Sequence, residues 1–245
     1  MAKHSTYFRK PKRFMIDNDY LSVKKYKGIN NLPGDCLFET PRSNYINNNL
    51  EYSGKKVLDI GCNTGFFLFN ALDQGAESVV GYEGSKSALE ILLEYSKDQG
   101  DVTIKDEYFD FKTLSDVFDI THCLNVVHHL GDDYGDQNIS ISEAKLSILK
   151  QIDYLGNISD RLVFQMGYNW KGDVNFPLFK SGEKREMIDF IRSGLKNWAV
   201  ERVSVAELHD DVVVYSDLDS ENLRRYDALG EFLNRPIFIM KSIAM

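Results

Sequence analysis

The chain has 245 residues, 43% of them hydrophobic and 12% aromatic, with a formal net charge of −8. This length and composition can bury one substantial core, so we expect a single α/β domain with an extension. No run of 18 apolar residues occurs and the amino terminus lacks the apolar segment of a signal peptide, which predicts a cytoplasmic protein without a membrane partner. The three cysteines, Cys36, Cys62 and Cys123, form no C-x-x-C pair, which argues against disulfides and a zinc site.

Positive charge is concentrated at the start of the chain. Residues 1–30 hold eight Lys or Arg and two Asp, a balance of +6, which leaves −14 for the other 215 residues. Because phosphate binding needs clustered cations, a general nucleic-acid surface on the rest of the chain is not expected. We therefore divide the chain into a basic extension or lid, residues 1–40, and a main domain, residues 41–245. The extension is interpreted as a solvated arm or a homodimer contact.

A buried-strand pattern over residues 56–60 runs directly into a glycine-bearing turn and then a helix over residues 65–74. Gly61 and Gly65 allow the backbone to turn tightly against a ligand. A dinucleotide site would need G-x-G-x-x-G, and the middle glycine is absent, because Cys62 and Asn63 follow Gly61. The turn therefore indicates a nucleoside cofactor without a pyrophosphate.

These residues resemble motif I of the class I S-adenosylmethionine (SAM) methyltransferases. The resemblance covers roughly residues 41–245 and implies SAM as cofactor, bound by Asp59 at its cationic end and by the turn of Gly61, Cys62, Asn63 and Gly65. In this family a short helix before the first strand often closes over SAM. Arg42 or Tyr45 could there meet the SAM carboxylate, although either could simply cap and pack.

The next strand, residues 78–83, ends on Glu83, 24 positions after Asp59, which is the distance a βαβ unit requires. An ionised carboxylate there can accept both ribose hydroxyls of an adenosine. The alternative is that Glu83 begins a solvated turn before a helix over residues 85–98.

A third strand, residues 102–105, is followed by an acid flanked by aromatic residues. Phe111 and its neighbours could sandwich an adenine ring, with Asp110 accepting a hydrogen bond from the exocyclic amine. Acid–aromatic pairs also occur at ordinary helix starts, so this assignment has a plain structural alternative.

The fourth strand, residues 118–124, leads into N-V-V-H-H-L, and its spacing matches motif IV of the same family. The resemblance places Asn125 near the reactive methyl group. Methyl transfer to a hydroxyl benefits from a base, and His128 or His129 could supply it. Adjacent side chains point in different directions, so at most one of them is expected to act, and either could instead pack or shape the pocket. His122 is interpreted as structural.

The same region could hold a divalent ion, because His128, His129, Asp132, Asp133 and Asp136 lie close together in sequence and His209-Asp210-Asp211 follows later. The segment is equally typical of a solvated loop, and SAM chemistry needs no metal. We therefore assign no metal.

A fifth strand over residues 161–167 ends in a cluster of aromatic and polar residues at the edge where an acceptor would dock: Tyr168, Asn169, Trp170 and Lys171. Rings and amides suit a sugar or an aromatic acceptor, and the lysine suits a phosphorylated one. The alternative is that these rings close the core under a loop.

The remaining periodicity predicts helices over 142–154, 183–195 and 220–233 and strands over 198–208 and 235–240, with Ser140 and Glu143 spaced as a capping box. Alternation of strand and helix predicts a doubly wound α/β fold with helices on both faces. The family resemblance implies seven strands, mostly parallel, with an antiparallel last strand.

Three functions follow. The first is O-methylation of a small molecule or saccharide, possibly phosphorylated or nucleotide-linked. The second is an RNA-modifying enzyme, because P-R-S before motif I and V-x-H-H after the fourth strand resemble the bacterial transferases that modify wobble uridine in tRNA; the acidic main domain counts against it. The third is a non-catalytic SAM-binding scaffold or regulatory subunit.

Overall fold

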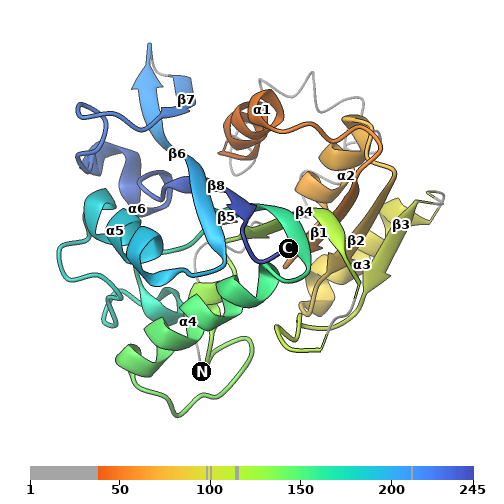
Figure 1. The fold of residues 1–245 in the computed structure, drawn as a ribbon, viewed down its shortest axis with the longest axis horizontal. Helices are drawn as coiled ribbons and strands as arrows, with labels where there is room; N and C mark the ends of the chain where they lie inside the picture. The colour runs from red at the N-terminus through yellow and green to blue at the C-terminus, as the bar shows by residue number, and fades with distance from the viewer. Residues whose placement is uncertain (1–37, 98, 100, 114–115, 211) are drawn as a thin grey trace. The chain divides into compact units, whose positions relative to one another are not determined.

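The computed structural model describes residues 38–97, 99, 101–113, 116–210 and 212–245 (Figure 1). The chain divides into two compact units between Phe109 and Asp110, and each unit is described by itself. Residues 1–37, which hold nearly all of the predicted extension and Cys36, lie outside the described residues, so the homodimer contact predicted there stays a prediction.

The first unit alternates helices with parallel strands. Its elements are α1 (Glu39–Asn49), β1 (Lys56–Ile60), α2 (Phe66–Asp73), β2 (Ser78–Tyr82), α3 (Lys86–Ser96) and β3 (Val102–Lys105). β2 pairs in parallel with both β1 and β3. α2 packs on β1 and β2, and α3 packs on β3. The apolar runs of β1 and α2 are buried, which explains why neither shows the alternation of a half-exposed element.

The second unit begins with a parallel pair and continues with antiparallel strands. Its elements are β4 (Phe118–Leu124), η5 (Val127–His129), α4 (Ile141–Leu155), β5 (Ser159–Gln165), η6 (Trp170–Gly172), α5 (Lys184–Gly194), β6 (Trp198–His209), β7 (Val212–Asp217), η7 (Asp227–Leu229), α6 (Gly230–Leu233) and β8 (Ile237–Ser242). β4 and β5 are parallel, and β8 inserts antiparallel between β5 and β6. The capping box of Ser140 and Glu143 starts α4, as predicted.

The predicted α/β fold is confirmed, with parallel strands first and antiparallel strands last. The described residues contain eight strands instead of seven, because Val212–Asp217 folds back on β6 as a hairpin. β5 begins two residues earlier than predicted. Among the residues described, no helix is long and apolar enough to cross a membrane.

The prediction of a helix over residues 220–233 is wrong. Asp219 Oδ1 accepts hydrogen bonds from the backbone N–H groups of Glu221 and Asn222, at 2.7 and 2.8 Å, which makes a side-chain turn in place of a helical start. Gly230 then adopts a φ of 71°, and only Gly230–Leu233 forms an α-helix. Local side-chain bonds therefore outweigh the helical periodicity of this segment.

Candidate active site

The turn after β1 is built on left-handed backbone. Gly61, Asn63 and Gly65 have φ values of 65°, 53° and 90°, a region that glycine and asparagine adopt most readily. A Cβ on Gly65 would lie 2.6 Å from the Phe69 ring and 2.7 Å from a Leu92 methyl group. Gly65 is therefore required both by its backbone conformation and by the packing around it.

Glu83 is fixed by two backbone donors. The N–H of Asn63 donates to Oε2 at 2.7 Å, and the N–H of Ser85 donates to Oε1 at 2.6 Å. Charge-assisted bonds of this kind hold the carboxylate in one orientation. The arrangement suits recognition of two ribose hydroxyls.

Tyr108 lies over Gly84, the residue that follows Glu83. Its ring passes so close to Gly84 that a Cβ there would lie 2.6 Å from the ring carbons. Tyr108 is 47% exposed, so it presents an aromatic side chain to solvent. Phe109, by contrast, is buried with its ring edge-on to Tyr82.

Asp59 is a buried acid with unused hydrogen-bonding capacity. The residue is 4% exposed, and Oδ2 has no hydrogen-bond partner among the described residues. Burial raises the pKa of this carboxyl well above its usual range; the nearby charge of Glu83 raises it further, and Arg42 opposes the shift. A buried acceptor without a donor is costly, and the cationic amino group of SAM would supply one. The motif I turn, Glu83 and Asp59 therefore fit SAM.

The remaining residues predicted around motif I are buried. Arg42 is 1% exposed; its Nε donates to the Phe38 carbonyl at 2.8 Å, and its guanidinium lies 4.9 Å from the centre of the Phe67 ring. Tyr45 is also buried. Burial raises the pKa of the Cys62 thiol, so Cys62 contributes shape to the turn and not a thiolate.

The predicted adenine contacts after β3 differ in exposure. Asp110 is exposed and accepts a hydrogen bond from the Thr113 hydroxyl at 2.9 Å. Phe111 is buried and stacks on Tyr134, with ring centres 5.9 Å apart. Their contact with adenine stays a prediction.

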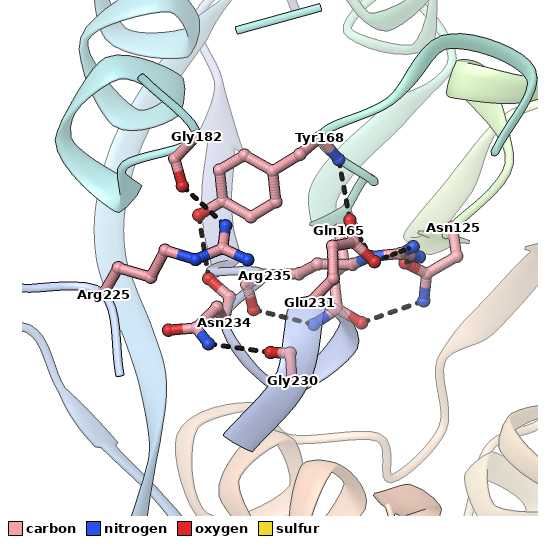
Figure 2. A network of polar contacts seen from close by, with 9 residues as sticks. All are labelled: Asn125, Gln165, Tyr168, Gly182, Arg225, Gly230, Glu231, Asn234 and Arg235. Atoms are coloured by element: carbon pink, nitrogen blue, oxygen red, sulfur yellow. Dashed lines mark hydrogen bonds and ion pairs between the residues drawn. The ribbon is translucent and has the colours of Figure 1, made fainter. Parts of the chain in front are cut away.

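Asn125 directly follows β4 and has a left-handed backbone conformation, with a φ of 65°. Figure 2 shows its amide held from two sides. Nδ2 donates to Gln165 Oε1 at 3.0 Å, and Oδ1 accepts from Arg235 Nη1 at 2.7 Å. The side chain of Gln165 in turn donates to the Arg235 carbonyl at 2.9 Å. This closed ring fixes the Asn125 side chain at the carboxyl end of β4.

Arg235 links this ring to the segment that follows β5. Its guanidinium, in a residue 3% exposed, pairs with Glu231, with Nη2 and Oε2 separated by 2.6 Å. Glu231 Oε1 also accepts from the Tyr168 backbone N–H at 3.0 Å, as Figure 2 shows. The strand ends are therefore joined by residues up to 110 positions apart.

The structure separates the two adjacent histidines. His128 is 1% exposed, and a Cβ on Gly167 would lie 2.7 Å from its ring. Burial lowers the pKa of His128 well below its usual value, and His129 and Arg235 lower it further. The side chain of His129 is 18% exposed, and its Nδ1 lies 3.6 Å from Asp133 Oδ2. His129 is therefore the more exposed histidine of the pair.

Two of the four predicted acceptor residues lie in the core. Tyr168 and Trp170 are 3% and 6% exposed; the Tyr168 hydroxyl donates to the Asn234 carbonyl, and the Trp170 indole N–H donates to the Leu130 carbonyl. Asn169 and Lys171 are half-buried. Lys171 has a φ of 56° and places Nζ over the Trp170 ring. Of these four residues, Asn169 and Lys171 retain access to solvent.

Known methyltransferases resemble this chain in sequence and in fold. A family model described as a methyltransferase domain matches residues 58–146, which include the motif I turn, Glu83, Asn125 and both histidines. A solved structure from Listeria monocytogenes, assigned to the S-adenosylmethionine-dependent methyltransferases, superposes with a TM-score of 0.53 at 14% identity and covers 85% of this chain and 99% of that one. Residues 58–146 therefore match a methyltransferase domain, and the fold is that of the class I SAM-dependent methyltransferases. SAM is the cofactor that this family uses.

Curated relatives of this methyltransferase are named tRNA U34 carboxymethyltransferases. The protein from Campylobacter lari is 27% identical over 201 residues, which cover 76% of this chain and 62% of that protein. The protein from Campylobacter hominis is 34% identical over 88 residues, which cover 34% of this chain and 30% of that protein. The match thus spans less than two thirds of either relative. The solved structure of WbdD with a kinase inhibitor shares the fold, with a TM-score of 0.53 at 16% identity over 97% of this chain and 45% of that one.

Several residues of this methyltransferase were not identified from the sequence alone. Glu231 and Arg235 have the i,i+4 spacing of an ion pair, which is a usable signal, but nothing in the sequence connects them to Asn125. Tyr108, by contrast, was among the aromatic residues expected to contact adenine, although its position over Gly84 depends on the path of the chain after β3.

Proposed function

We propose that this protein is a SAM-dependent transferase that alkylates the wobble uridine, U34, of tRNA. The observation that carries the cofactor half is the Glu83 carboxylate, held by two backbone N–H groups beside the glycine turn. The acceptor half is supported by the names of the curated relatives, of which the Campylobacter lari protein matches three quarters of this chain.

The residues that would bind SAM have distinct roles. Glu83 would bind the ribose, Asp59 the amino group, and the turn of Gly61–Gly65 would allow close backbone approach. When bound, SAM supplies an alkyl group on a sulfonium, which makes that group open to in-line attack. The protein's part is alignment, and rigid backbone-held groups suit alignment better than mobile side chains do.

The exposure of the side chains supports the choice of residues that would contact the acceptor. His129, with Asp133 next to it, is accessible where His128 is enclosed. Lys171 is a cation on the loop after β5, and its Nζ lies 3.4 Å from the Gln137 carbonyl. A uridine acceptor would bring its nucleobase to the His129 imidazole and a phosphate to the Lys171 ammonium group.

The sequence alone favoured a small-molecule or saccharide acceptor, since residues after 30 carry −14. That charge does not disfavour RNA if local cations make the contacts, because affinity depends on the phosphates neutralised and not on the net charge. The curated relatives support the RNA alternative more than the small-molecule one.

The test uses the full chain with tRNA transcripts that carry either uridine or cytidine at position 34. SAM and a donor carboxylated on its transferable methyl are offered separately, and nucleosides are analysed by mass spectrometry. We expect alkylation at position 34 of the uridine transcript alone, and the mass added distinguishes methyl from carboxymethyl transfer.

SAM binding, measured in parallel by calorimetry, separates the other outcomes. Alkylation of saccharides or phenols without tRNA modification would replace this proposal with the small-molecule function. Binding of SAM without turnover on any acceptor would support the non-catalytic scaffold.

A further inference from the structure

The turn after η5 gathers one imidazole and two carboxylates. His129, Asp132 and Asp133 place one ligand atom each so that all three lie within 4.8 Å of one another. All three residues are half-buried. Of the other His and Asp residues considered from the sequence, none joins this group among the described residues, and Asp211 lies outside them.

The backbone brings the three side chains together. The N–H groups of Asp132 and Asp133 both donate to the His129 carbonyl, at 3.0 and 3.2 Å, and Gly131, which precedes Asp132, takes a left-handed φ of 82°. The turn therefore folds the two carboxylates back over the imidazole through bonds that do not involve the side chains.

The spacing of the ligand atoms fits a bound cation. His129 Nδ1 and Asp133 Oδ2 are 3.6 Å apart, which is too long for a direct hydrogen bond. Ligand atoms about 2.1 Å from a common metal ion lie about 3 to 3.5 Å apart at tetrahedral or octahedral angles. The separation of His129 Nδ1 and Asp133 Oδ2 is close to this range, and the other separations, which are at most 4.8 Å, would have to contract around an ion.

A second imidazole adjoins the cluster. The rings of His128 and His129 have centres 4.3 Å apart, and His128 is 1% exposed. Its Nδ1 has no hydrogen-bond partner among the described residues. Buried polar atoms in proteins are usually hydrogen-bonded, and a water bound to a cation is a suitable partner for this one.

We propose that His129, Asp132 and Asp133 form a site for a divalent cation that accepts mixed nitrogen and oxygen ligands, such as Mn²⁺ or Zn²⁺. Three protein ligands leave coordination positions open. An oxygen of the acceptor can take one of them, which would hold a hydroxyl in place and lower its pKa. The site itself does not depend on the acceptor being tRNA.

The experiment is titration of the chelator-treated full chain with MnCl₂, followed by calorimetry and by the paramagnetic resonance of free Mn²⁺. We expect one saturable Mn²⁺ per chain, with Asp132→Asn/Asp133→Asn weakening binding at least tenfold. The matched control is Asp136→Asn, which alters an exposed acid of the same loop that lies outside the cluster. Melting curves confirm that each variant is folded.

Absence of saturable binding of both Mn²⁺ and Zn²⁺, or equal binding by wild type and the double variant, would overturn the proposal. In a second variant, His129→Gln, weaker Mn²⁺ binding with an unchanged melting temperature would support it, and unchanged binding would remove the imidazole from the site. None of these readouts requires turnover, so failure here and failure of the proposed tRNA activity are distinguishable.

Discussion

The glycine turn of the first unit and the strand ends of the second unit are stabilised in opposite ways. Around Glu83, the backbone N–H groups of Asn63 and Ser85 hold one carboxylate, and these three residues lie close together in the sequence, between positions 63 and 85. Around Asn125, side chains hold side chains, and Arg235 is 110 residues away. The first arrangement is read from a local motif, whereas the second exists only once β8 has inserted beside β5.

The largest expected effect comes from breaking the long-range arrangement. Arg235→Met should lower the free energy of unfolding by about 3 to 5 kcal/mol, because it leaves the partly buried Glu231 carboxylate without its cation. The matched control is Arg202→Met, which removes an ion pair to Asp217 with side chains 46% and 58% exposed. Such exposed pairs contribute about 1 kcal/mol or less. Equal losses in urea denaturation would show that the buried network is not special.

The local arrangement is broken at Gly65. Gly65→Ala should cost about 2 to 4 kcal/mol, from left-handed backbone strain and from overpacking against Phe69 and Leu92. Gly54→Ala isolates the strain, because Gly54 has a φ of 67° and nothing lies within 4 Å of its Cβ position. Thermal unfolding should show the larger loss at Gly65, and comparable losses would contradict the steric argument.

Glu83→Gln sharpens the comparison by changing function more than stability. The carboxamide loses charge-assisted bonds and turns an NH₂ group toward one backbone N–H, so SAM affinity should fall by about 2 kcal/mol, roughly 30-fold. Calorimetry with SAM measures this, with Glu90→Gln on the exposed side of α3 as the control. Unchanged affinity would remove Glu83 from the cofactor site.

The smallest effect appears as a dependence on pH. Burial lowers the pKa of His122, inside β4, to about 3. Between that value and about 6.5, the unfolded chain binds a proton that the folded chain does not, so stability falls as the pH falls, by about 1.4 kcal/mol per pH unit. His122→Gln should remove this share, measured by urea denaturation at about pH 7 and pH 5. A variant with the wild-type slope would show that His122 is not buried neutral.

Prediction from the sequence succeeded where the determinants are close together in the chain. The apolar run of β1, the turn glycines and the acid that ends the following strand were each specified within one βαβ unit. Prediction failed over residues 220–233, where side-chain turns at Asp219 replace a helix. It also missed β7, because a hairpin extension needs a partner strand that local periodicity does not reveal.

The candidate site follows the same rule. His128 and His129 were equivalent in the sequence, and only burial made one neutral and enclosed and left the other accessible. Tyr168 and Trp170 were expected to offer aromatic faces to an acceptor, yet their polar atoms bond to carbonyls of distant segments and their rings are buried.

The sequence by itself determined three things: the strand-turn-helix start of the fold, the family resemblance, and the acids that suit a nucleoside cofactor. All three depend on residue types at short spacing. Tertiary structure decided which histidine is accessible, which aromatic residues are core, and how Asn125 is held. Those properties depend on burial and on partners far apart in the chain, and no local pattern of residues encodes either.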